Sequence, residues 1–151
     1  MSRKMPAMLY IFFKSLHIFV AIAWVMGLMV CGVLLRTRDR DASHEQQRIF
    51  NSRMATIAQN ISHWWVMPCM ATTLLAALYM TVVAGWWQMH WVFAKLAGAA
   101  LLVLFAVLQA RAARRWRQNP MALPSAQLGL LVPLTLIVGF VLLYLAFTKP
   151  F

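Results

Sequence analysis

Residues 10–35 read YIFFKSLHIFVAIAWVMGLMVCGVLL and are followed by Arg36. The stretch contains two basic side chains, Lys14 and His17, and is otherwise almost entirely apolar. An α-helix rises about 1.5 Å per residue, so this segment is long enough to cross the roughly 30 Å hydrocarbon core of a bilayer. The sequence therefore predicts a membrane-spanning helix at 10–35.

Three further apolar stretches have a comparable length, and composition places all four in lipid. Hydrophobic residues make up 63% of the 151-residue chain and charged residues 11%, with a mean hydropathy of +0.71. A soluble domain carries roughly 25% charged residues. Since lipid cannot satisfy backbone hydrogen bonds, the spans should be helices. We expect an all-α, integral membrane four-helix bundle in a single domain, 1–151, with spans at 10–35, 63–84, 91–110 and 128–147.

The distribution of charge predicts the orientation of the bundle. The chain has 14 Lys and Arg and three Asp and Glu, giving a net charge of +11. Most of these cations lie in the first and third connections, whereas the link 85–90 has no Lys or Arg. By the positive-inside rule, both arginine loops are cytoplasmic and both termini are outside, with Arg3 and Lys4 opposing this mildly. We therefore interpret the basicity as membrane orientation, expect no nucleic-acid partner, and predict a multi-pass protein of a bacterial inner membrane.

Carboxylates and aromatic residues refine this picture. All three acidic residues lie within 39–45, which disfavours a proton relay built on Asp or Glu inside a span. Tryptophans at the two ends of the second span and at the following turn predict aromatic belts at both interfaces: Trp64, Trp65, Trp86, Trp87 and Trp91. Trp24 lies mid-span, so its ring N–H should find a partner inside the bundle. Part of the first loop, 43–59, is compatible with a surface helix presenting Ile49, Phe50, Met54 and Ile57 on one side.

Ionisable side chains within spans are the first candidates for function, because burying them is costly. Lys14 and His17 lie three residues apart on one helix face, and Lys95 lies about one turn into the third span. With His90 and Lys149, they should meet at the outer end of the bundle. A neutral imidazole can ligate haem iron, and lysines can pair with the propionates of a tetrapyrrole. Alternatively, the lysines snorkel to headgroups and His17 donates a hydrogen bond to a backbone carbonyl.

Sulfur side chains form a second candidate set. Met26, Met67, Cys69 and Met70 are soft ligands that would suit Cu(I), although Met is also a common packing residue. A disulfide between Cys31 and Cys69 is not expected in the reducing cytoplasmic half. His63 is more easily read as an interfacial residue and His44 as a solvated one. Pro68 and Pro133 each remove a backbone donor within a span and should kink it.

Several short motifs resemble those of the HemJ-type membrane proteins. Residues 13–18 (FKSLHI) and 23–28 (AWVMGL) are similar to the opening "K-x-x-H-I … W-x-x-G-L" helix of that family. Residues 67–70 (MPCM) resemble its "M-x-P-A-M" stretch, and 91–96 (WVFAKL) its "W-L-x-x-K-L" stretch. The ending 149–151 (KPF) is similar as well. The first helix ends in VCGVLLR, without the histidine of the family pattern, so the resemblance is to a divergent member.

The resemblance implies a small four-helix protein that binds haem b and oxidises protoporphyrinogen IX to protoporphyrin IX in haem biosynthesis. His17 would be the haem-iron ligand, with Lys14, Lys95 and Trp24 as the other cofactor-binding residues. Electrons would leave to a membrane quinone or another acceptor. Two alternatives remain open: a copper-handling protein of the CopD type, which has a similar opening helix, and a non-catalytic accessory subunit of a larger membrane electron-transfer complex. The small size favours a homo-oligomer or a partner subunit.

Overall fold

The computed structural model describes residues 7–37, 43–121 and 126–148, and within these ranges all regular structure is helical. Four helical segments are long and apolar enough to cross a membrane, which confirms the predicted all-α, four-span architecture. In chain order, the elements are α1 (Ala7–Arg36), α2 (His44–Ile61), the π-helical turn η1 (Ser62–Val66), α3 (Met67–Ala84), the 3₁₀ turn η2 (Trp86–Gln88), α4 (His90–Gln118) and α5 (Ala126–Thr148).

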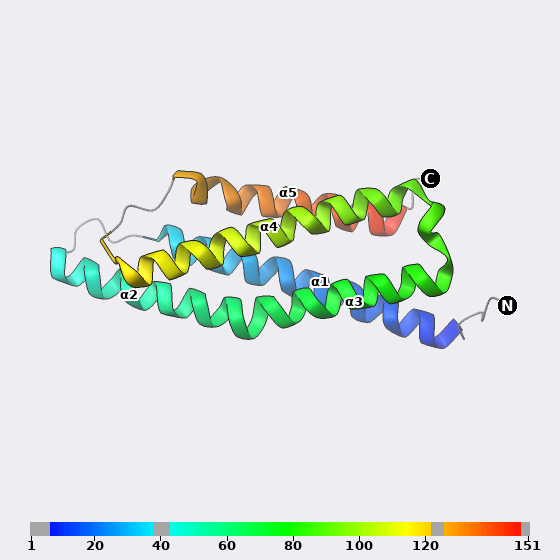
Figure 1. Ribbon diagram of the computed structural model, residues 1–151, viewed down its shortest axis with the longest axis horizontal. Helices are drawn as coiled ribbons and strands as arrows, with labels where there is room; N and C mark the ends of the chain where they lie inside the picture. Colours follow the sequence, from blue (N-terminus) through cyan, green and yellow to red (C-terminus); the bar gives the residue numbers. More distant parts are fainter. Residues whose placement is uncertain (1–6, 38–42, 122–125, 149–151) are drawn as a thin grey trace.

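The helices run alternately up and down along one long axis (Figure 1). The start of α1, the turn η2 and the end of α5 lie at one end of the molecule, which we call the turn end. The end of α1, the start of α2, the end of α4 and the start of α5 lie at the opposite end. We call this the arginine end, because the described arginines occur in these segments: Arg36, Arg48, Arg53, Arg111, Arg114, Arg115 and Arg117.

The second span is longer than its sequence suggests. α2, η1 and α3 form one continuous helical segment, His44–Ala84, of 41 residues. The helix therefore begins well before residue 63, and the predicted span 63–84 is its second half. A capping box begins the helix, because Ser43 accepts from the Gln46 N–H while the Gln46 side chain accepts from the Ser43 N–H. At η1 the turn widens, and the Met67 N–H bonds to the Ser62 carbonyl five residues back. Pro68 follows at the start of α3, so the helix passes the proline without ending.

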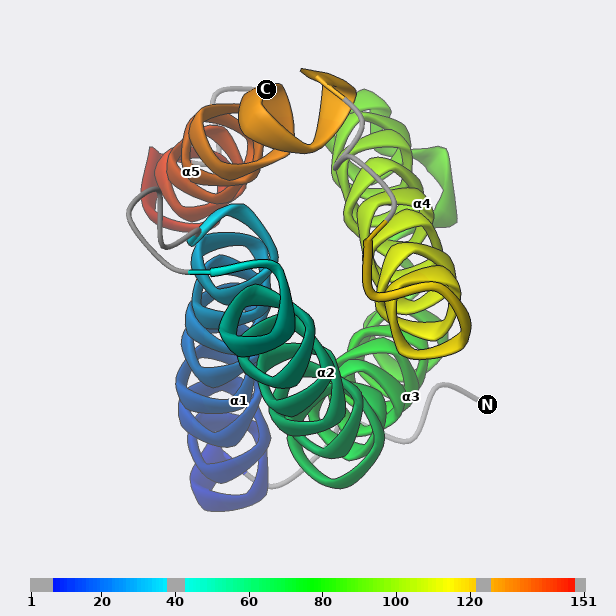
Figure 2. The ribbon, with the colours of Figure 1, turned by 90° about the vertical axis from the view of Figure 1, so that its left-hand side faces the viewer.

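The helix predicted within 43–59 exists, and it packs on the bundle through a different face from the one that carries Ile49 and Ile57. Ile49 and Ile57 are exposed, whereas Asn51, Ala55 and Ala58 are buried. These small side chains allow α2 to pack closely against the last turns of α1 and α4, where Leu35, Ala113 and Trp116 complete an apolar cluster. α2 therefore lies alongside its neighbours as an extension of the bundle (Figure 2).

The main core joins α1, η1, α4 and α5. Trp24, Leu28 and Cys31 of α1 pack with residues of the other elements, of which the buried ones are Val66, Leu102, Phe105, Ala106 and Leu131. In this core, a glycine allows α4 and α5 to approach each other closely. A Cβ built on Gly98 of α4 would lie 2.6 Å from a methyl group of Leu142 on α5. At the turn end, Gly85 ends α3 in the left-handed conformation (φ 69°) that favours glycine, and this reverses the chain into η2.

The docking of α2 can be tested by overpacking its buried face. Ala58→Leu should lower the free energy of unfolding by about 1–3 kcal/mol, because the added volume has no space against α1 and α4. Ile57→Leu, on the exposed side of the same helix, is the matched control and should be nearly neutral. Thermal denaturation in detergent measures both. Equal stability of the two variants would contradict the packing of α2 described here.

Candidate functional site

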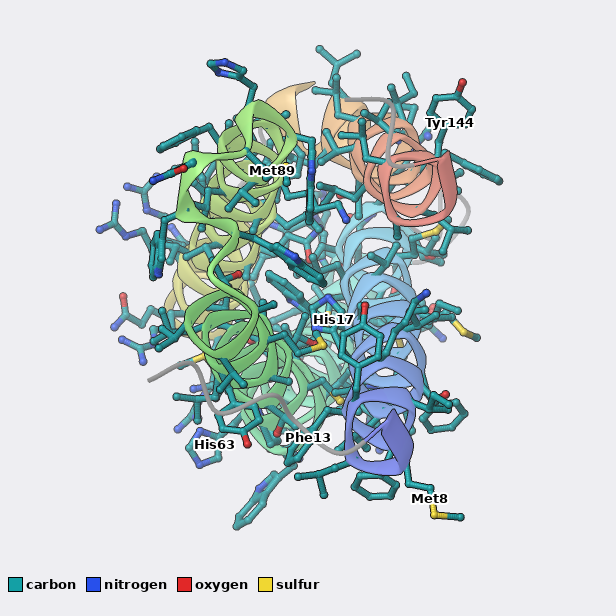
Figure 3. The ribbon with its side chains drawn as sticks, turned by 90° about the vertical axis from the view of Figure 1, so that its right-hand side faces the viewer. Met8, Phe13, His17, His63, Met89 and Tyr144 are labelled. Atoms are coloured by element: carbon teal, nitrogen blue, oxygen red, sulfur yellow. The ribbon has the colours of Figure 1, made fainter. Side chains whose placement is uncertain are left out.

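His17 lies between the helices at the turn end and is hydrogen-bonded across them. Its Nδ1 is 3.0 Å from the backbone carbonyl oxygen of Thr73 on α3. A carbonyl oxygen only accepts, so Nδ1 carries the proton and, in the neutral ring, Nε2 carries the lone pair. Figure 3 shows His17 inside the bundle, whereas His63 and Tyr144 lie at the periphery. The hydrogen bond to a backbone carbonyl is one of the two roles that the sequence suggested for His17. It leaves Nε2 as the nitrogen that can bind a metal or a proton.

Lys95 approaches the same region from α4. Its Nζ lies 4.5 Å from the centre of the Trp91 ring, a cation–π contact, and its charge acts electrostatically on His17. Lys14 is half-buried and lies one turn before His17 on α1. His17 and Lys95 thus belong to separate helices, and the Lys95 charge acts on the His17 ring; that they hold one ligand together stays a prediction. His90 begins α4 and is exposed, and Lys149 lies outside the described residues.

Several aromatic rings from different elements contact one another at the turn end, and the sequence did not predict these contacts. Tyr10 meets Trp86 edge-on at 6.1 Å between ring centres, and Trp86 packs against Trp91 at 5.3 Å. Phe13 packs against Tyr79 at 4.9 Å. Tyr10 and Phe13 are three residues apart and share the helix face of His17, so their spacing in the sequence could have predicted these aromatic contacts. Trp91 is only 6% exposed, because it packs against its neighbours within the bundle, whereas Trp87 is 47% exposed; the predicted aromatic belt stays a prediction.

Trp65 makes a second contact that sequence reasoning missed. Its ring N–H donates to the Ala23 carbonyl on α1 at 3.0 Å, and Gly27 makes room for the indole. A Cβ on Gly27 would lie 2.8 Å from Trp65 Cδ1. Trp65 therefore joins η1 to α1, in addition to any interfacial role. Its neighbour Trp64 is 77% exposed and has the edge of His63 against its ring.

Two polar side-chain atoms near His17 are buried without a hydrogen-bond partner among the described residues. One is the hydroxyl of Thr73, the residue whose carbonyl receives the His17 proton. The other is the ring N–H of Trp24, two turns along α1 on the His17 face. The expected bundle partner for Trp24 is thus not observed, and the side chain packs in the main core. Each unpaired atom is a donor or acceptor that a bound ligand or water could satisfy.

The sulfur side chains do not form an enclosed set. Met26 is 61% and Met67 50% exposed, while Cys69 and Met70 pack at the edge of the main core. Cys31 is buried and donates to the Ala58 carbonyl, and both cysteines are free thiols. Among the described residues, no three His, Cys, Asp or Glu side chains gather as a metal cluster. A thioether site for Cu(I) needs sulfur ligands that converge on one point, and two of the four candidates, Met26 and Met67, belong to exposed side chains.

The donor set at the turn end fits a tetrapyrrole better than a free metal ion. A single imidazole nitrogen with a fixed tautomer suffices for one axial position of haem iron. Aromatic rings suit the faces of a planar macrocycle, and ammonium groups suit its carboxylates. The same groups would be poor ligands for a metal ion held by protein alone, because lysines and indoles contribute no coordinating atoms at neutral pH.

The unpaired Thr73 hydroxyl predicts an unusual response to mutation. Thr73→Val keeps the shape of the side chain and the backbone carbonyl that binds His17. It should stabilise the ligand-free protein by about 1 kcal/mol, because a buried unsatisfied hydroxyl is removed. Thr81→Val on the same helix is the control: its hydroxyl donates to the Ala77 carbonyl at 2.8 Å, so the change should be neutral or destabilising. Denaturation in detergent compares the two, and a loss of stability in Thr73→Val would show that the hydroxyl has a partner.

Comparison of the chain with protein-family models, with curated proteins and with solved structures finds no match.

Proposed function

We propose that the protein binds haem or a related porphyrin at the turn end, with His17 as the axial ligand. The observation that supports this most directly is the hydrogen bond from His17 Nδ1 to the Thr73 carbonyl. It fixes the tautomer and the orientation of the ring, as second-shell carbonyls do for metal-ligating histidines, and leaves Nε2 for the iron. Lys14 and Lys95 neutralise the propionates, and the aromatic rings of α1, α3 and α4 provide apolar contacts for the macrocycle.

The resemblance to HemJ-type proteins extends this proposal to a reaction. In that case, the protein is a divergent member that oxidises protoporphyrinogen IX to protoporphyrin IX, with hydrogen leaving the substrate and electrons passing to a membrane acceptor such as a quinone. A bound haem would supply one-electron redox chemistry. The chain's own residues hold the ligand, pair with its carboxylates and keep bulk water from the ring. The catalytic residues are not assigned.

The same proposal includes an orientation. The arginine end faces the cytoplasm and the turn end faces outward, because lysine and arginine retained on the cytoplasmic side determine topology. The protein is then a multi-pass component of a bacterial inner membrane, and the tetrapyrrole site lies near its outer face. Among the alternatives, the CopD-like copper protein is disfavoured by the exposed Met26 and Met67 side chains.

Absorption spectroscopy tests the haem site. The detergent-purified protein should show a Soret band when oxidised and resolved α and β bands after dithionite reduction. His17→Ala should remain folded and lose these bands, because the Nε2 ligand is gone. His63→Ala, which removes an exposed imidazole away from the site, is the matched control and should retain them. A featureless spectrum of the wild-type protein after expression with ample haem would refute the proposal.

Titration with haem tests the role of Lys95. Lys95→Ala should weaken haem binding by about tenfold or more, since a charge-assisted contact to a propionate contributes about 1.5–3 kcal/mol. Arg111→Ala, which removes an exposed cation at the arginine end, should leave the affinity unchanged. Haem dimethyl ester, whose propionates carry no charge, should bind wild type and Lys95→Ala equally well. If the Lys95 substitution weakened both ligands alike, the propionate contact would be wrong.

A further inference from the structure

Three arginines of α4 lie together on its outer face at the arginine end. Arg114 and Arg115 follow Arg111 by three and four residues, so the three side chains leave the same side of the helix, and all of them are exposed. The opposite side of these turns carries Ala113 and Trp116, which are buried against the bundle. The three arginines, which we call the α4 arginine cluster, therefore point away from the protein.

The described part of the protein does not balance the charge of this cluster. None of its three arginines has a hydrogen bond or an ion pair with another described residue, whereas Arg117, on the side facing α2, donates to the Gln59 side chain at 3.0 Å. Among the described residues, the carboxylate at this end is Glu45, which precedes Asn51 by more than a turn, and Asn51 already reaches the Pro120 carbonyl beyond the end of α4. Because like charges three or four residues apart repel, the cluster favours an anion from outside the chain.

The cluster begins where the apolar outer face of α4 ends. Leu104, Val107 and Leu108 are exposed on the same side of the helix, in the two turns before Arg111. About 20 helical residues cross the roughly 30 Å hydrocarbon core of a bilayer, so the predicted span 91–110 uses that thickness fully. When the apolar side chains lie against acyl chains, the next turn brings the arginines to the level of the lipid phosphates.

Guanidinium groups are well suited to a phosphate diester at this level. Their planar fork donates two parallel hydrogen bonds to phosphate oxygens. A headgroup with a net negative charge attracts such cations more strongly than a zwitterionic one, whose ammonium group offsets the phosphate. A soluble anion has the same oxygens but no acyl chains for the exposed leucines. One anionic phospholipid therefore satisfies both the arginines and the apolar side chains beside them.

We propose that the α4 arginine cluster binds the phosphate of an anionic phospholipid, whose acyl chains lie against Leu104, Val107 and Leu108. The bound phosphate relieves the repulsion among the three guanidinium groups. This site requires only that the apolar part of α4 lies in a bilayer. It is thus independent of the tetrapyrrole at the turn end and of the side of the membrane that the arginine end faces.

Native mass spectrometry of the delipidated full chain tests the lipid preference. From an equal mixture of phosphatidylglycerol and phosphatidylcholine, the wild-type protein should retain phosphatidylglycerol when it is released from detergent. Arg111→Gln combined with Arg115→Gln should weaken phosphatidylglycerol binding by about tenfold or more, since each arginine beside an anionic headgroup contributes about fivefold. Equal retention of the two lipids by the wild-type protein would overturn the proposal.

A second double variant removes the same charge from another helix. Arg48→Gln combined with Arg53→Gln changes two exposed arginines of α2 and is the matched control. It should leave phosphatidylglycerol binding nearly unchanged, because neither residue lies on the outer face of α4. Circular dichroism checks that both double variants keep the helical content of the wild-type protein. Equal weakening by the two variants would show that lipid responds to total charge, which contradicts a site on α4.

Competition with inorganic phosphate separates a lipid site from a site for a soluble anion. At equal ionic strength, phosphate should displace phosphatidylglycerol no better than chloride does, because it makes no contact with the apolar face of α4. Displacement by phosphate, with chloride having no effect, would assign the cluster to a soluble anion and contradict the proposal.

Discussion

A peptide group surrounded by hydrocarbon can bond only to other parts of the protein, and this constraint underlies the architecture of the bundle. Each span is helical because a helix satisfies its own backbone. Where the ladder is disturbed, the chain compensates locally: η1 widens by one residue before Pro68, and the Met67 N–H finds the Ser62 carbonyl. Pro133 also interrupts the ladder of α5, because proline has no N–H to donate.

Helix carbonyls also serve as acceptors for contacts between helices. His17 donates to Thr73, Trp65 to Ala23, and Cys31 to Ala58, in each case to a backbone oxygen on a neighbouring element. Since a helical carbonyl retains a lone pair after its own ladder bond, these contacts do not unwind the acceptor helix. α1 takes part in all of them and also packs against α5, so it is the central element of the fold.

The polar groups of α1 mark three levels of the bundle with different chemistry. His17, Trp24 and Cys31 recur at intervals of seven residues and therefore lie along one inward face. The His17 level is aromatic and carries lysines, and it has the chemistry for a planar anionic ligand. The Trp24 level is close-packed and apolar, and it separates the turn end from the arginine end. At the Cys31 level, small residues bring α2 and α4 close to α1, and Gln109 introduces polarity again.

Composition and hydropathy were sufficient to predict four spans, since only lipid accommodates so apolar a chain. The placement of the start of the first span beside the start of the third was also predictable, because short connections make the helices alternate in direction. The union of α2 with α3 was not predictable from periodicity, since its buried face consists of Asn51, Ala55 and Ala58, whose low hydrophobicity gives no apolar stripe. The partners of His17 and Trp65 are backbone carbonyls of other helices, which the sequence alone does not identify. Local sequence determined the helices. The distances between helices, which glycine and alanine set only in three dimensions, decided which polar groups found a partner within the bundle.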